Sequence, residues 1–167
     1  MPTISEMLNM TRNKIGLALL GMAFAFLVIA VTAALWFEEK SMADPDNSQQ
    51  VALGKSVYDG RCASCHGARL EGQPNWQGKL PSGRMPAPPH DASGHTWHHP
   101  DAMLFGMTKY GLIPGKYAPP GYQSDMPAFG GMLSDEQIWA VLAYIKSSWP
   151  SDTRRTQQEM TLKQSRR

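Results

Sequence analysis

The feature that most constrains this chain is a five-residue motif, Cys62-Ala63-Ser64-Cys65-His66. Two cysteines separated by two residues and followed at once by a histidine are typical of covalent haem attachment. Each thiol then forms a thioether with one vinyl group, and the histidine coordinates the iron. The sequence contains no other cysteine. The motif therefore predicts one haem c, bound through Cys62 and Cys65, with His66 as one axial ligand.

Two other roles of a Cys-x-x-Cys pair fit the sequence less well. A tetrahedral zinc site usually takes further cysteine or histidine ligands from a second spaced pair, and no second cysteine pair exists here. A disulfide redox pair is expected within alternating strands and helices, and the flanking sequence shows no such alternation. Haem attachment is the preferred interpretation.

An uncharged apolar block covers residues 15–37. As a helix, about 23 residues suffice to cross a hydrocarbon core of about 30 Å. Trp36 and Phe37 end the block, where aromatic rings favour the membrane interface. Arg12 and Lys14 precede it, so the positive-inside rule predicts a cytoplasmic N-terminus, residues 1–14. The rest of the chain would then lie on the periplasmic face of a bacterial inner membrane.

A cleaved signal peptide is the alternative, because Ser41-Met42-Ala43 resembles a cleavage site of small residues. The apolar region of a signal peptide is usually about 7–15 residues long, which is shorter than this block. An uncleaved anchor is therefore preferred. Both interpretations export the domain. Export agrees with the motif, because the two thiols must stay available until haem is attached to them outside the reducing cytosol.

The remaining chain divides by composition. Residues 38–48 are predicted to be a short linker, residues 49–149 the haem domain, and residues 150–167 a polar basic tail that we expect to be mobile. The formal net charge of the whole chain is only +2. Nothing in this balance indicates a nucleic-acid partner.

Three helices are predicted in the haem domain, over residues 49–61, 100–110 and 134–149. In the first, Gly54 lies on an otherwise apolar face, which is often a sign of a close helix crossing. In the last, Ser134 and Gln137 have the spacing of a capping box, and Pro150 ends the helix. The predicted fold class is all-α.

The arrangement of Gly54, Tyr58 and Cys62 before an apolar C-terminal helix resembles class I cytochromes c. The resemblance covers about residues 49–149 and implies three or more short helices wrapped round a covalent haem. Residues 124–130, Ser-Asp-Met-Pro-Ala-Phe-Gly, are similar to the loop that carries the family's methionine ligand. The resemblance therefore implies that Met126 is the second axial ligand of the iron, opposite His66.

Other methionines compete with Met126 for this role. Met85 is also followed by proline, and Met132 lies just before the last helix. Met103 and Met107 fall on the predicted short helix, where a core position is the default for methionine. Met85 and Met132 remain the main alternatives.

Four histidines, His90, His95, His98 and His99, lie close together in the sequence. A copper or zinc site is one hypothesis, since imidazole suits both metals. The preferred interpretation is a loop that braces the haem, with Trp97 and one histidine donating to its propionates. A similar Gly-His-x-Trp-His-His-Pro-Asp stretch occurs in some bacterial cytochromes c of this class.

With His66 and Met126 filling both axial positions, the iron would have no open site for a substrate. The resemblance thus implies an electron carrier rather than an enzyme: a membrane-tethered monohaem cytochrome c of a respiratory chain, with membrane-bound redox complexes as donor and acceptor. One alternative is a cytochrome subunit of a larger respiratory or photosynthetic oxidoreductase. A haem-based sensor or peroxidase would require a labile Met126, and a metal-delivery protein is the weakest alternative.

Overall fold

The computed structural model describes residues 21, 22, 25 and 42–166. The predicted cytoplasmic segment 1–14, nearly all of the predicted anchor 15–37 and the first residues of the predicted linker lie outside the described residues. The chain divides into two units, Met1–Lys40 and Ser41–Arg167, and the description below concerns the second. Within the described ranges, none of the helices has the length and apolar character needed to cross a bilayer.

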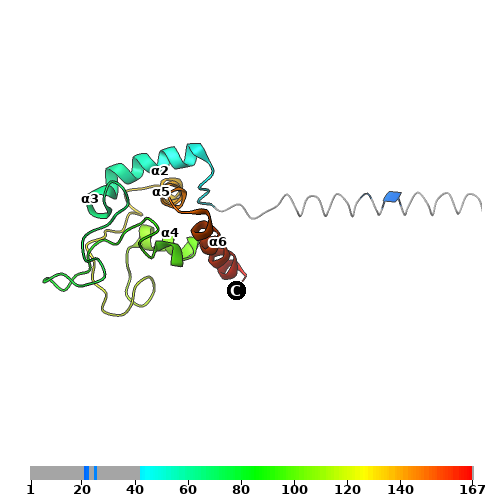
Figure 1. Ribbon diagram of the computed structural model, residues 1–167. Coiled ribbons are helices and arrows are strands. Elements are labelled where there is room, and N and C mark those ends of the chain that lie inside the picture. Colours follow the sequence, from blue (N-terminus) through cyan, green and yellow to red (C-terminus); the bar gives the residue numbers. More distant parts are fainter. Residues whose placement is uncertain (1–20, 23–24, 26–41, 167) are drawn as a thin grey trace, which may run out of the picture. The chain divides into compact units, whose positions relative to one another are not determined.

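The second unit is built from helices and long irregular segments (Figure 1). The helices are α2 (Ser48–Arg61), α3 (Ala63–His66), the 3-10 helix η1 (Thr96–His98), α4 (Asp101–Tyr110), α5 (Asp135–Ser147) and α6 (Ser151–Ser165). Its described residues form no β-strand, only the isolated bridges Met85–Ser124 and Pro114–Ala118. The predicted all-α class is confirmed, and the three predicted helices correspond to α2, α4 and α5.

Helices α2 and α5 cross at Gly54. A Cβ atom at this position would lie 1.9 Å from the carbonyl oxygen of Ala140, so any larger residue would force the helices apart. One turn further along α2, the ring of Tyr58 packs against Tyr144 with centroids 5.3 Å apart. The close crossing predicted from the glycine is confirmed.

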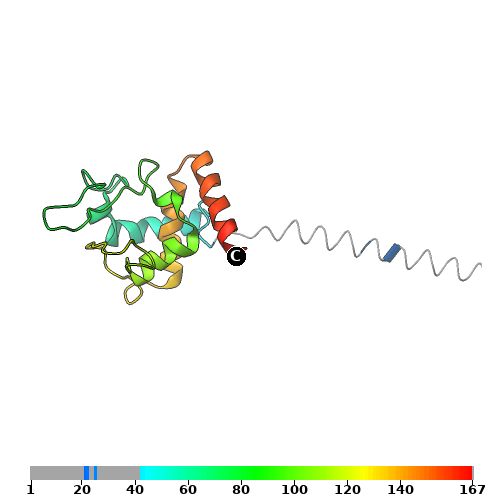
Figure 2. The same cartoon turned by 90° about the horizontal axis from the view of Figure 1, so that it is seen from below.

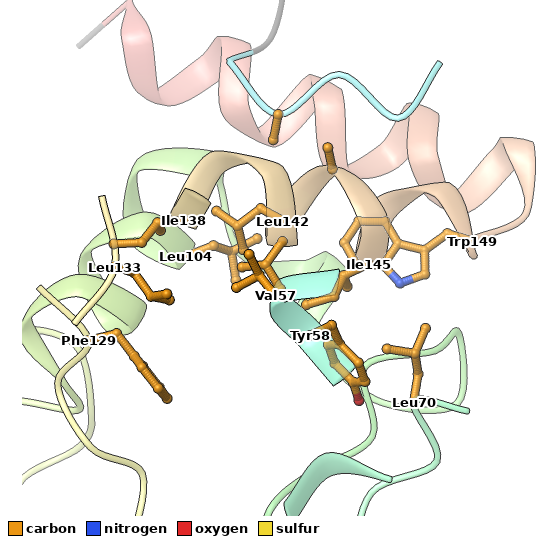
Figure 3. Close-up of a cluster of buried hydrophobic side chains, with 13 residues drawn as sticks. Val57, Tyr58, Leu70, Leu104, Phe129, Leu133, Ile138, Leu142, Ile145 and Trp149 are labelled. Carbon is orange, nitrogen blue, oxygen red and sulfur yellow. The ribbon is translucent and has the colours of Figure 1, made fainter. Parts of the chain in front are cut away.

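The core lies along this crossing. Figure 3 shows Val57 and Tyr58 of α2 lying against Leu142 and Ile145 of α5. The start of α5 is fixed by the predicted capping box, in which Ser134 Oγ accepts from the Gln137 amide and the Gln137 side chain accepts from the Ser134 amide. The helix thereby enters the core in a defined register.

The expectation of a mobile tail after residue 150 is wrong. Pro150 ends the preceding turn and caps a new helix, α6, which runs to Ser165 at the edge of the unit (Figures 1 and 2). The side chain of Gln157 is fully buried and donates to Asp101 and to the carbonyl of His99. Hydrogen bonds rather than an apolar stripe dock this helix. The periodicity of apolar residues therefore did not predict a helix here.

Two long segments, residues 67–95 and 111–134, carry no α-helix. They run on the same side of the unit, next to α3 and α4 (Figure 1). Their irregular course agrees with the Gly- and Pro-rich sequence. Together with the helices they surround the cavity described next.

Candidate haem-binding site

A cavity of about 980 Å³ lies between the helices and the two long segments. Its wall is mostly apolar and includes Leu104, Phe129 and Leu142. All four residues predicted to bind a haem line this one cavity: Cys62, Cys65, His66 and Met126. The structure thus brings together residues from α3 and from a loop sixty positions further along the chain.

Cys65 lies in the short helix α3, and Cys62 is the residue between α2 and α3, where it occupies the N-cap position of α3. Both cysteines line the cavity. Cys62 is half-buried and Cys65 is exposed. Burial, together with the neighbouring Cys65, raises the pKa of the Cys62 thiol to about 11. The free Cys62 thiol is therefore neutral at physiological pH.

His66 ends α3 with its ring buried. Its Nδ1 lies 2.8 Å from the carbonyl oxygen of Pro88, which can only accept, so Nδ1 carries the proton. The lone pair is then on Nε2, as a metal ligand requires. Burial lowers the pKa of His66, and the bond to Pro88 only partly offsets that effect, so the ring stays neutral. Pro88 was not anticipated, because nothing in the sequence pairs it with His66.

His90 stacks on His66, with ring centroids 4.0 Å apart and planes inclined by 22°. Its Nδ1 is 2.8 Å from the hydroxyl of Thr96, and its carbonyl accepts from Trp149 Nε1 at 2.7 Å. Burial, followed by the proximity of His66, holds the pKa of His90 well below its usual value. This histidine packs beside the predicted iron ligand rather than belonging to a surface cluster.

Two other histidines of the loop, His95 and His99, make different ring contacts. His95 stacks on Trp76 at 5.2 Å and meets the edge of His99 at 5.5 Å, and both histidines line the cavity. Across the described residues, no group of three or more His, Cys, Asp or Glu side chains is arranged to hold a metal ion. The structure thus offers no support for the copper or zinc hypothesis.

Trp97 does not take the role expected for it. Its Nε1 donates to the carbonyl of Gly94 at 3.1 Å and so braces its own loop. The Nδ1 atom of His95, in contrast, is buried without a hydrogen-bond partner. That atom is the better candidate for a donor to a propionate.

The residues present fit a haem c. The cavity volume lies at the upper end of the range of about 300–1,000 Å³ typical of cofactor sites. Its wall combines two thiols, a neutral imidazole with a free Nε2 and a thioether with mostly apolar surface. The unpartnered Nδ1 of His95 offers a polar contact at the same wall. These are the donors and the dry surface that a covalently bound porphyrin needs.

The loop carrying Met126 is held by an internal hydrogen bond and by two bonds to the end of α4. The Met126 amide donates to Ser124 Oγ at 3.1 Å, and the amides of Phe129 and Gly130 donate to the carbonyls of Thr108 and Lys109 at the end of α4. The competing methionines divide into two groups. Met85, Met103 and Met107 line the cavity with Met126, whereas Met132 is 47% exposed and lies outside the lining.

Comparison with known proteins agrees with this site. Residues 51–149 match the family model for cytochrome c. The chain is 30% identical over 120 residues to the gluconate 2-dehydrogenase cytochrome c subunit of Pantoea cypripedii, an alignment that covers 70% of this chain but only 24% of that subunit. It is 31% identical over 103 residues to cytochrome c-555 of Prosthecochloris aestuarii, covering 57% of this chain and 84% of that protein.

No solved structure matches the chain at a significant level. The family match covers the segment that resembles class I cytochromes c, and it includes both the Cys-x-x-Cys-His motif and Met126. That resemblance is confirmed. The chain belongs to the cytochrome c family, whose members carry electrons on a covalently attached haem c.

Proposed function

We propose that this chain is a membrane-tethered cytochrome c with one haem, held through Cys62 and Cys65 and ligated by His66 and Met126. The observation that carries the proposal is that these four side chains line one cavity although Met126 is sixty positions from His66. The chain has only two cysteines, which is the number that one haem c requires.

Backbone and side-chain groups of the cavity have distinct roles in this function. Pro88 fixes the tautomer and orientation of His66 through Nδ1, which makes Nε2 the ligand atom. The Met126 thioether is a soft ligand that favours the reduced metal and raises the potential. The apolar wall excludes water and so limits the solvent reorganisation that accompanies a change of charge. When bound, haem c supplies a reversible one-electron couple.

The experiment that tests this function is ligand binding by the purified reduced holoprotein. Because His66 and Met126 take both axial positions, we expect no rapid binding of carbon monoxide, together with a reversible one-electron couple and one covalent haem per chain. Rapid and complete carbon monoxide binding would instead support a haem-based sensor or peroxidase and defeat the proposal.

The membrane tether is part of the same proposal. The apolar block 15–37 supports a single span, and the basic residues before it support a cytoplasmic N-terminus with the haem domain in the periplasm. We expect full-length protein in the inner-membrane fraction after a carbonate wash, with its haem domain open to protease in spheroplasts. A soluble mature protein that lacks residues 15–37 would show that the block is a cleaved signal.

A second candidate function is that of a cytochrome subunit fixed in a larger oxidoreductase. The observation in its favour is the similarity to a protein named as the cytochrome c subunit of gluconate 2-dehydrogenase. Purification in mild detergent separates the two candidates. Partners recovered in constant stoichiometry would favour the subunit, whereas a free monohaem protein would favour the carrier.

A further inference from the structure

The side chain of Arg84 reaches the loop that carries Met126, forty residues further along the chain. Its Nη2 donates to the carbonyl oxygen of Ser124. Its Nε lies 2.5 Å from Oδ1 of Asp125, an ion pair in which the two atoms are not aligned as a hydrogen bond. Both contacts fall on the two residues directly before Met126.

The backbone next to Arg84 adds a second restraint on the same loop. The amide of Met85 donates to the carbonyl of Gln123 at 2.8 Å, and Met85 forms an isolated parallel bridge with Ser124. Neither restraint depends on the bonds that follow Met126, which tie Phe129 and Gly130 to α4.

The segment 84–88 also reaches the other predicted ligand. Its last residue is Pro88, whose carbonyl accepts from His66 Nδ1 at 2.8 Å. Between the two ends, Ala87 is bonded to Gln73 through both its amide and its carbonyl, each at 2.9 Å. Pro86 and Pro88 have fixed φ angles, which stiffens the segment. A run of five residues therefore connects the acceptor that orients His66 to the contacts that hold the Met126 loop.

We propose that Arg84 is a positioning residue for Met126: through Ser124 and Asp125 it holds the loop so that the thioether keeps its place at the iron. This inference rests on the proposed function, in which Met126 is an axial ligand. The guanidinium group suits the task because its planar fork can engage a carbonyl and a carboxylate together.

The side chains of Arg84 and Asp125 are 38% and 73% exposed, so the ion pair alone is a weak restraint. The bond to the Ser124 carbonyl and the adjacent backbone pairing carry most of the effect. Without Arg84 the loop opens more often, and an added ligand then competes better with Met126.

The test is a titration of the ferric holoprotein with imidazole, which displaces the methionine from the iron. Displacement is monitored as the loss of the charge-transfer band of methionine-ligated haem. Arg84→Met keeps much of the apolar stem but removes the charge and the donors. We expect it to bind imidazole about tenfold more tightly than the wild type. Asp125→Asn leaves the bond to Ser124 in place, and we expect a smaller gain of about threefold.

Arg154→Met is the matched control. Arg154 pairs with Asp46 at 2.9 Å, with exposed fractions of 33% and 82%, and neither residue lines the cavity. We expect its imidazole affinity to equal that of the wild type. Arg84→Lys, which keeps the charge but not the fork, should fall between the wild type and Arg84→Met.

The outcomes separate this inference from the proposed function. Wild-type imidazole affinity in Arg84→Met, or an equal gain in Arg154→Met, would overturn the role of Arg84. If Arg84→Met does not fold, wild-type imidazole affinity in Arg84→Lys, which lacks the fork, would overturn it instead. A charge-transfer band that survives Met126→Ala would show that the proposed ligand itself is wrong, whatever the Arg84 variants do.

Discussion

Tyr58 connects α2 to the end of the haem-binding motif. Its side chain is fully buried, and its hydroxyl donates to the carbonyl of Gly67 at 2.8 Å. Gly67 directly follows His66 and has a φ of +81°, a left-handed value that other residues rarely adopt. Burial raises the pKa of Tyr58 well above its usual value. The neutral hydroxyl is therefore the form that the fold requires.

Tyr58→Phe should give a pH-dependent stability difference. At pH 7 we expect the free energy of unfolding of the variant to be about 1 kcal/mol lower than that of the wild type, because one buried hydrogen bond is lost. The folded-state pKa of Tyr58 is raised, so the hydroxyl's contribution is complete below pH 10 and falls as the pH rises beyond that value. Urea unfolding of both holoproteins should show that the difference in their free energies of unfolding disappears near pH 11. A difference that stays constant from pH 7 to pH 11 would refute this account.

At the scale of single residues, the candidate ligands were the most predictable part of the site. Cys62, Cys65 and His66 form a local motif, and Met126 lies in a loop resembling that of a known family. Their roles as ligands stay predictions, although all four reach one cavity. The acceptor Pro88 could not be foreseen, because its contact with His66 joins positions 22 apart through the tertiary fold.

The α2–α5 crossing is the element-scale contact that positions the site. Gly54 removes the side chain at the point of closest approach, where the Ala140 carbonyl and the Tyr144 Cβ lie within 2.9 Å of an added Cβ. The motif begins one residue after α2 ends, at Cys62. A shift of α2 would therefore move the thioether positions.

Gly54→Ala should destabilise the holoprotein by about 1–3 kcal/mol, since the added methyl group overpacks the crossing. Gly60→Ala is the matched control in the same helix, because nothing lies within 4 Å of its added Cβ. There we expect a gain of up to about 1 kcal/mol from the better helix propensity of alanine. Equal effects of the two substitutions in urea unfolding would contradict the close crossing.

Helix α6, with 15 residues, is the longest element that the sequence did not reveal. Its anchor is a buried polar network, in which Lys146 Nζ contacts both carboxylate oxygens of Asp101 at 3.0 and 2.9 Å. Gln157 Nε2 donates to the same carboxylate at 2.6 Å. The side chains of Lys146 and Asp101 are only 5% and 6% exposed. A single buried glutamine in a polar helix leaves no periodic pattern to detect.

Gln157→Ala should cost about 1–3 kcal/mol of unfolding free energy, because it removes a charge-assisted donor from the buried Asp101 carboxylate. The control is Gln158→Ala, since the neighbouring glutamine is exposed and should tolerate the change within about 0.5 kcal/mol. Denaturant titration of the two variants checks the prediction. An unchanged free energy of unfolding in Gln157→Ala would mean that α6 is not docked through this network.

At the scale of the whole molecule, local patterns predicted α2, α4 and α5, whereas long-range contacts determined the cavity. The start of α5 followed from the capping signal at Ser134, whereas the helix ends at Ser147, two residues before the end expected from Pro150. The stacking of His90 on His66 and the role of Trp97 within its own loop followed from tertiary packing instead. The helices thus frame a cavity whose polar details the sequence alone did not determine.

The central claim is that His66 and Met126 close both axial positions, which makes the protein an electron relay. The most direct test is the methionine charge-transfer band of the ferric holoprotein in Met126→Ala, with Met85→Ala as control because Met85 lines the same cavity. We predict that Met126→Ala loses the band and binds carbon monoxide when reduced, while Met85→Ala keeps the band. Persistence of the band in Met126→Ala, or its loss in Met85→Ala, would contradict the account.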